Sequence, residues 1–165
     1  VDPVMLVSTS RAGECQSVVS LVGNWLEHGA PSREGTRARI LANEIEILYP
    51  RLQHANKAIM ENFVAELRCV APVSWSKHPT DHDEIGSSIS VRTMHSAKGL
   101  QRRAIVLLWT DLLPMTNEPD KVQQDRGLLY MALTRAEDLL VMTRSGRSEF
   151  TDEMERRLAI TDTRS

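Results

Sequence analysis

Short apolar runs alternate with amphipathic helical segments along most of the 165 residues of this chain. Residues 104–109 are apolar throughout, which is typical of a strand buried on both faces of a parallel sheet. Residues 14–28 instead carry apolar side chains at steps of three and four, the spacing of a helix with one buried face. Strands that alternate with helices need crossover connections, so the sequence predicts an α/β fold, a mostly parallel sheet with helices on both faces.

The same patterns place the remaining elements. We expect a buried strand at 4–7 and further strands at 45–49, 70–75, 89–93 and 139–143. We expect further helices at 53–68, at 122–136 and near the C-terminus around Phe150, Met154 and Leu158. With 41% hydrophobic and 25% charged residues the chain fits a single globular domain. We place this domain at 1–160, followed by a frayed polar tail at 161–165.

Composition and charge exclude several classes of protein. The longest apolar run is far shorter than the roughly 18 residues of a membrane span, and the N-terminus has no signal-peptide pattern. Cys15 and Cys69 share no metal or redox spacing and are expected to be small buried residues. We therefore expect a cytoplasmic location and no membrane partner. The net charge is -2, yet residues 92–147 carry nine basic and six acidic side chains, so an anion is most favoured there.

Ligands of parallel sheets usually bind beyond the carboxyl ends of the strands, so the loops after Val7, Tyr49, Thr93 and Trp109 are the expected places for a site. The tryptophans are expected to pack in the core, although Trp75 and Trp109 follow strand-like runs and could instead stack on a base. Tyr130 is expected to pack beneath its helix. The set His78, Asp81, His82 and Asp83 allows a metal site but fits a solvated loop better.

A polar segment with the sequence TMHSAKGLQ follows the strand expected at 89–93. Lys98 offers a point charge, Thr93 and Ser96 offer hydroxyl groups, and Gly99 lets backbone N–H groups approach an oxyanion. This combination indicates phosphate binding. From the residues alone, a polar loop in which the glycine only makes a turn remains an alternative.

A second segment, residues 125–136, combines a helical apolar face with Arg135 near the helix end. An arginine in such a position can place a fixed charge against a transferring phosphate. The alternative is a solvated arginine that interacts favourably with the helix dipole.

Together the two segments resemble the fifth and sixth motifs of the UvrD/PcrA/Rep family of superfamily-one DNA helicases. The family patterns are close to T-x-H-x-A-K-G-L-E and R-L-x-Y-V-A-x-T-R-A. Here they stand as TMHSAKGLQ and GLLYMALTRA, in the same order and with a buried strand between them. The segment EIEILYPR at 44–51 also resembles the family's I-A-V-L-Y-R entry into its second motor domain.

The resemblance implies the second of two RecA-like motor domains, with ATP bound between them. The N-terminal RecA-like domain of the same protein would supply the P-loop and the acidic residues that hold Mg²⁺. By match, Arg135 would be the catalytic arginine at the γ-phosphate, and Gly99 and Gln101 would lie beside the nucleotide. The chain's other partner would be single-stranded DNA, which the family follows from 3′ to 5′. Thr93, His95 and Lys98 would link the DNA backbone to the nucleotide site.

Three departures from the family patterns affect this interpretation. Gln101 replaces a glutamate, so it can hydrogen-bond a ribose hydroxyl but cannot act as a base. Arg102 stands where the family has an aromatic residue. Pro50 replaces the arginine after Leu-Tyr, and Arg51 follows one place later. Because a shift of one residue turns a side chain the other way, the role of Arg51 as a second γ-phosphate contact stays open.

No G-x-x-x-x-G-K-[ST] sequence occurs in the chain. We therefore expect the chain to be a piece of a larger helicase that uses ATP and Mg²⁺. On its own, the chain is expected to bind neither ATP nor Mg²⁺ and to hydrolyse no ATP. One alternative is a non-catalytic nucleic-acid-binding or regulatory module derived from such a helicase, which Gln101 and the shifted Arg51 favour and Arg135 disfavours. Another is a doubly wound domain that binds a different phosphate ligand.

Overall fold

The computed structural model describes residues 3–75, 87–97 and 101–162, with side chains up to residue 159. Six strands pair in parallel in the order β1-β8-β7-β4-β6-β5. The strands are β1 (Val4–Val7), β4 (Ile45–Tyr49), β5 (Val73–Trp75), β6 (Ile89–Thr93), β7 (Arg102–Leu107) and β8 (Ala136–Arg144). The helices are α1 (Arg11–His28), α2 (Lys57–Arg68), α3 (Pro119–Leu133) and α4 (Glu149–Asp162). The predicted α/β architecture is confirmed.

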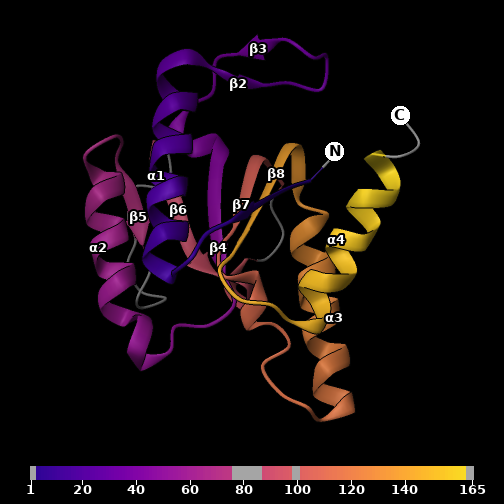
Figure 1. Cartoon of the computed structure of the whole chain (residues 1–165). Helices are drawn as coiled ribbons and strands as arrows, with labels where there is room; N and C mark the ends of the chain where they lie inside the picture. The colour runs from indigo at the N-terminus through magenta and orange to yellow at the C-terminus, as the bar shows by residue number, and fades with distance from the viewer. Residues whose placement is uncertain (1–2, 76–86, 98–100, 163–165) are drawn as a thin grey trace.

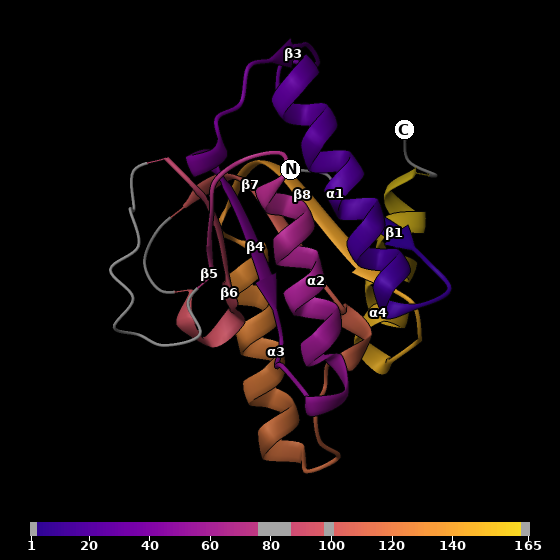
Figure 2. The same ribbon diagram turned by 90° about the vertical axis from the view of Figure 1, so that its left-hand side faces the viewer.

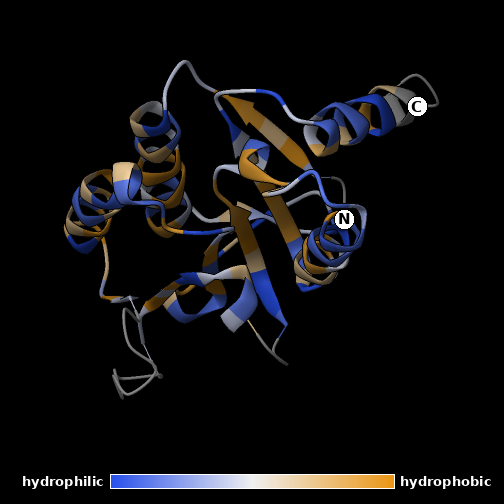
Figure 3. Ribbon diagram, turned by 90° about the horizontal axis from the view of Figure 1, so that it is seen from below, coloured by the Kyte–Doolittle hydropathy of each residue, from blue (hydrophilic) through white to orange (hydrophobic). Residues whose placement is uncertain are grey.

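The helices form a layer on each face of the sheet, with α1 and α2 on one face and α3 and α4 on the other (Figure 1). Viewed from the first of these faces, α2 and α1 lie in front of the strands and α3 lies behind them (Figure 2). Ile45, Ile47 and Tyr49 of β4 belong to the core beneath α1 and α2, whereas Leu48 belongs to the core beneath α3 and α4. This alternation follows from the period of two residues in a strand. Seen from below, the strands are largely hydrophobic, and the helices around them carry both hydrophilic and hydrophobic residues (Figure 3).

Two elements near the N-terminus differ from the sequence-based expectation. Strand β1 pairs with β8 alone and forms an edge of the sheet, so Val4 and Val7 are 51% and 58% exposed rather than buried. The stretch after α1, for which the sequence predicted no strand, contains a small antiparallel hairpin of β2 (Ala30–Pro31) and β3 (Arg37–Ala38). Gly29 joins α1 to this hairpin with φ 82° and ψ 164°, a conformation that is essentially restricted to glycine.

Several element boundaries also differ from the prediction. Helix α3 begins at Pro119, a residue suited to the first turn of a helix, and ends at Leu133. Strand β8 begins at Ala136, earlier than expected, because its first residues extend the pairing with β7. Helix α4 reaches Asp162, inside the segment expected to be frayed, and 163–165 lie outside the described residues. None of the helices in the described part of the chain has the length and apolarity needed to cross a bilayer.

The strands of the parallel sheet all run in one direction, so their ends define a carboxyl edge and an amino edge of the sheet. At the carboxyl edge, where the strands end, Tyr49 lies opposite Thr93 in the register of β4 and β6. At the amino edge, where the strands begin, the backbone N–H of Arg102 donates to the carbonyl of Arg135 at 3.0 Å. Ala136 and Thr143 of β8 are seven residues apart, so about 23 Å separates the edges at roughly 3.3 Å per residue.

Candidate functional site

The structure divides the predicted site residues between the two edges of the sheet. Gln101 and Arg135 lie at the amino edge, immediately before β7 and β8. Thr93 and His95 lie at the carboxyl edge, at the end of β6 and in the helical turn η3 (Met94–Ser96) that follows it. Lys98 and Gly99 are outside the described residues, and so is the histidine and aspartate set at 78–83.

Arg135 is held in place by the end of α3. Leu129 and Ala132 anchor this helix in the core against the sheet. The N–H of Arg135 donates to the carbonyl of Ala132 at 3.2 Å, and its own carbonyl accepts from Arg102 at 3.0 Å. Backbone bonds on both sides therefore fix the point from which the half-buried side chain of Arg135 extends.

Acidic side chains at the amino edge are already engaged by a different arginine. Arg103 Nε donates to Asp138 at 2.8 Å, and Arg103 Nη1 lies 3.7 Å from Glu44. A further carboxylate oxygen of Asp138 lies 3.8 Å from Arg33 of the β2–β3 hairpin. The two carboxylates therefore balance the charge of Arg103, and the contact of Arg33 with Asp138 connects the hairpin to the start of β8.

The carboxyl edge presents polar groups on a rigid base. Met94 is fully buried in the core beneath α3 and anchors the turn η3. Thr93 Oγ1 donates to Ser96 Oγ at 3.1 Å, and Ser96 Oγ donates to the carbonyl of Thr93 at 3.0 Å. The imidazole of His95 is exposed beside them. The turn thus places hydroxyl and imidazole groups at the surface, where an extended polyanion can reach them.

Arg51 lies at the carboxyl edge and not beside Arg135. It is exposed two residues beyond Tyr49, and Tyr49 is the direct neighbour of Thr93. Because Arg135 is at the opposite edge of the sheet, the structure does not bring the two arginines to one phosphate group. The possible role of Arg51 as a second γ-phosphate contact therefore has no geometric support within this domain.

Aromatic residues form a buried layer beneath the carboxyl edge. Trp75 Nε1 donates to the hydroxyl of Tyr49 at 3.2 Å, and the rings of Tyr49 and Trp109 are 6.3 Å apart and tilted. Both tryptophans are buried, so they pack in the core and cannot stack on a base. Trp109 adopts a left-handed φ of 58°, and its backbone N–H donates to Thr143 Oγ1 at 3.1 Å.

Three other sequence-based expectations about packing can be compared with the structure. Tyr130 is 69% exposed, so the expectation that it packs beneath α3 is wrong. It projects from the outer side of the helix, whose buried face is formed by other residues. Cys15 is buried as expected, and burial raises the pKa of its thiol to about 12. Cys69, which directly follows α2, is exposed rather than buried.

A buried ionic network lies beside the carboxyl edge and was not foreseen from the sequence. Arg11 donates two hydrogen bonds of 2.6 Å to the carboxylate of Asp111 and one of 3.1 Å to Glu14. Glu14 is fully buried and also accepts from Thr143 at 2.8 Å. Burial raises the pKa of Glu14 despite these bonds. Burial also acts to raise the pKa of Asp111, but the bonds and charge of Arg11 together with backbone N–H donors lower it overall. The only local signal was the spacing of three between Arg11 and Glu14.

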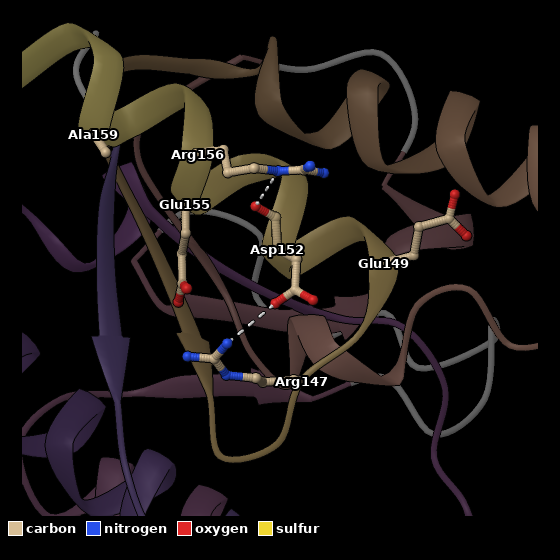
Figure 4. A pocket seen from close by; sticks show the side chains of 6 residues that line it. All are labelled: Arg147, Glu149, Asp152, Glu155, Arg156 and Ala159. Atoms are coloured by element: carbon tan, nitrogen blue, oxygen red, sulfur yellow. Dashed lines mark hydrogen bonds and ion pairs between the residues drawn. The ribbon is translucent and has the colours of Figure 1, made fainter.

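A hollow of about 560 Å³ lies along α4 and the turn before it. Figure 4 shows side chains of both charges around it. Arg147 lies 3.8 Å from Asp152, and Arg156 Nε donates to the carbonyl of Asp152 at 3.3 Å. None of the predicted site residues lines this hollow. Among the described residues, moreover, no three His, Cys, Asp or Glu side chains gather as metal ligands would.

Comparison with known proteins assigns the chain to a family. Residues 15–147 match the model of the UvrD-like helicase C-terminal domain, and this range contains both motif segments. The chain belongs to this family. Over 89 residues it is 30% identical to the ATP-dependent DNA helicase PcrA of Staphylococcus epidermidis and to that of Staphylococcus aureus. The match covers 50% of this chain and 11% of those helicases.

Solved structures show the same fold. The C-terminal domain of a possible DNA helicase from Lactobacillus plantarum WCFS1 aligns with a TM-score of 0.56 at 19% identity, covering 89% of this chain and 76% of that one. Domain 2 of the DEAD-box helicase Mss116p, solved with an RNA duplex, aligns with a TM-score of 0.50 at 13% identity, covering 87% and 54%. The UvrD-like C-terminal domain described here therefore has the RecA-like fold expected from the sequence.

Proposed function

We propose that this UvrD-like domain acts as the second motor domain of an ATP-dependent DNA helicase and supplies the γ-phosphate arginine, Arg135. The observation that carries the proposal is the position of Arg135, which backbone hydrogen bonds hold at the end of α3 and directly beside β7. A guanidinium with a fixed point of attachment can stabilise the charge on a transferring phosphate without first having to be ordered.

ATP with Mg²⁺ supplies the phosphoryl group that is transferred to water, and this domain's residues would act on it from one side. Arg135 would hold a positive charge against the γ-phosphate. Gln101, exposed at the same edge, would hydrogen-bond a ribose hydroxyl but remove no proton, because an amide is not a base. Gly99, by its match to the family motif, would lie beside the nucleotide. The ligands of Mg²⁺ and the P-loop would come from the companion N-terminal motor domain.

Single-stranded DNA would bind at the carboxyl edge, where Thr93 and His95 present polar groups. Arg51 is exposed at the same edge, two residues beyond the register partner of Thr93, so we assign it to a DNA phosphate rather than to ATP. Lys98, by its match to the family motif, would act with Thr93 and His95 in linking the DNA backbone to the nucleotide site.

The proposal predicts that the full-length protein hydrolyses ATP and that single-stranded DNA accelerates this hydrolysis. The measurement is the steady-state rate of phosphate release with and without an oligonucleotide, followed by strand displacement from a duplex with a 3′ overhang. The second candidate function is a non-catalytic nucleic-acid-binding module, because Gln101 stands where the family has an acidic residue. Binding of single-stranded DNA without any ATP hydrolysis would favour this candidate.

Arg51→Ala is expected to weaken binding of single-stranded DNA with little change in the KM for ATP. Loss of one phosphate contact reduces the dependence of log affinity on log salt concentration by about one unit, which titrations at several salt concentrations measure. Arg68→Ala is the matched control, because Arg68 is an exposed arginine at the end of α2, away from the carboxyl edge. A raised KM for ATP with unchanged DNA affinity would place Arg51 in the nucleotide site instead.

A further inference from the structure

A second arginine lies next to Arg135 at the amino edge. Arg102 is the first residue of β7, its N–H donates to the carbonyl of Arg135 at 3.0 Å, and it pairs in register with Ala136. The two arginines therefore extend from directly adjoining backbones. The resemblance to the family gives no reason for this pair, because the family has an aromatic residue at the position of Arg102.

The side chain of Arg102 is poorly satisfied by its protein neighbours. Its Nε is buried and has no hydrogen-bond partner among the described residues. Its Nη1 makes one long bond of 3.4 Å to the carbonyl of Gln101. Nor does any carboxylate of the described ranges form an ion pair with Arg102, since Asp138 is bound by Arg103 and Glu44 is shared between Arg103 and the N–H of Leu41.

Such an arrangement is unfavourable in the absence of an anion. The register partner of Arg102 is Ala136 and not Arg135, but two positive charges that extend from adjoining backbones still repel each other. A buried donor without an acceptor also loses its hydrogen bonds to water without replacement. An anion with several oxygens would offset the repulsion between the two arginines and accept the unsatisfied hydrogen bond of Arg102. Guanidinium groups present forked donors that match the oxygens of a phosphate. The amino edge thus has the features of a phosphate site that contains both arginines.

We propose that Arg102 joins Arg135 in clamping the terminal phosphate of ATP, which rests on the proposed role of Arg135. Arg102 would then provide the second positive charge that the sequence had suggested for Arg51. A DNA phosphate is the other source of the same chemistry. Nucleotide is favoured because Thr93, His95 and Arg51, the groups assigned to DNA, lie at the opposite edge of the sheet.

The test uses the full-length protein with Arg102→Gln, Arg102→Lys and Arg102→Phe, and Arg68→Gln as the charge-matched control. Affinities for a non-hydrolysable ATP analogue, for ADP and for single-stranded DNA are measured for each. Arg102→Gln is expected to weaken binding of the analogue roughly tenfold or more, the scale of a charge-assisted hydrogen bond, and to leave ADP affinity within about twofold. Arg102→Lys should retain part of the affinity for the analogue, because the charge remains. Arg102→Phe, which introduces the type of residue that the family uses, should retain no more than Arg102→Gln.

The outcomes separate this inference from the proposed function. If Arg102→Gln and Arg102→Phe bind the analogue like the wild type while Arg135→Ala loses turnover, the role of Arg102 is wrong and that of Arg135 stands. If Arg135→Ala keeps normal turnover, the proposed function itself fails. Weaker DNA binding with unchanged analogue affinity in Arg102→Gln would overturn the nucleotide clamp in favour of a DNA phosphate. If Arg102→Gln lowers the affinities for the analogue and for ADP equally and also lowers the unfolding midpoint, Arg102 has a structural role and the nucleotide clamp is overturned.

Discussion

Arg135→Ala is expected to lower the DNA-stimulated ATPase rate of the full-length protein by about 10³-fold or more, the scale of losses seen when an arginine finger is removed. The side chain extends from a backbone that is bonded on both sides, so its removal leaves the surroundings in place and deletes the charge itself. The effect should fall on kcat, because a charge that acts on the developing transition state contributes little to ground-state binding.

Two variants make this result interpretable. Arg135→Lys keeps the charge but loses the planar fork of donors, so it should recover only part of the rate. Arg68→Ala removes an exposed arginine from the end of α2 and should leave turnover unchanged. Steady-state phosphate release over a range of ATP concentrations gives kcat and KM for each protein. Normal turnover in Arg135→Ala would rule out the assigned role.

Asp111→Ala is expected to lower the free energy of unfolding of the chain by about 3–5 kcal/mol, which is typical when one partner of a buried ion pair is removed. Arg11 would lose both of its 2.6 Å bonds while remaining largely buried. The N–H groups of Ser145 and Gly146, which donate to the same carboxylate at 3.3 and 3.2 Å, would lose their acceptor as well. Urea unfolding followed by circular dichroism measures the change.

Arg147→Ala is the control for this second prediction. It breaks an ion pair with Asp152 in which the side chains are 72% and 47% exposed, so the cost should stay below about 1 kcal/mol. A similar loss in both variants would mean that the buried position of Asp111 has no special importance. A loss below about 1 kcal/mol for Asp111→Ala would show that the network is as weak as a surface pair.

Local periodicity was sufficient to predict most of the elements of the fold. The helix over α1 and the strands β4 and β6 follow directly from the spacing of their apolar side chains, because that spacing is set by the element's own geometry. The exposure of β1 and the β2–β3 hairpin were not predictable in this way. Whether a strand lies at an edge depends on how many other strands pair with it, and that is decided by residues more than a hundred positions away.

The candidate site shows the same limit. Two motifs of the right residue types identified Thr93, His95, Gln101 and Arg135, and their match to the family was confirmed by the comparison. The sequence could not show that these residues belong to opposite edges of the sheet. The rule that ligands bind beyond strand ends pointed to the carboxyl edge alone, yet Gln101 and Arg135 precede their strands.

The sequence by itself determined the α/β class, the order of its strands and helices along the chain and the helicase family, because each depends on residue types at short spacings. Only the tertiary structure decided which side chains meet. It placed Tyr49, two residues before Arg51, beside Thr93 and the backbone of Arg102 beside that of Arg135, and it brought Asp111 to Arg11 across a hundred residues. The physical reason is that strand order and register in a parallel sheet are set by the packing of the whole core, and no local pattern encodes them.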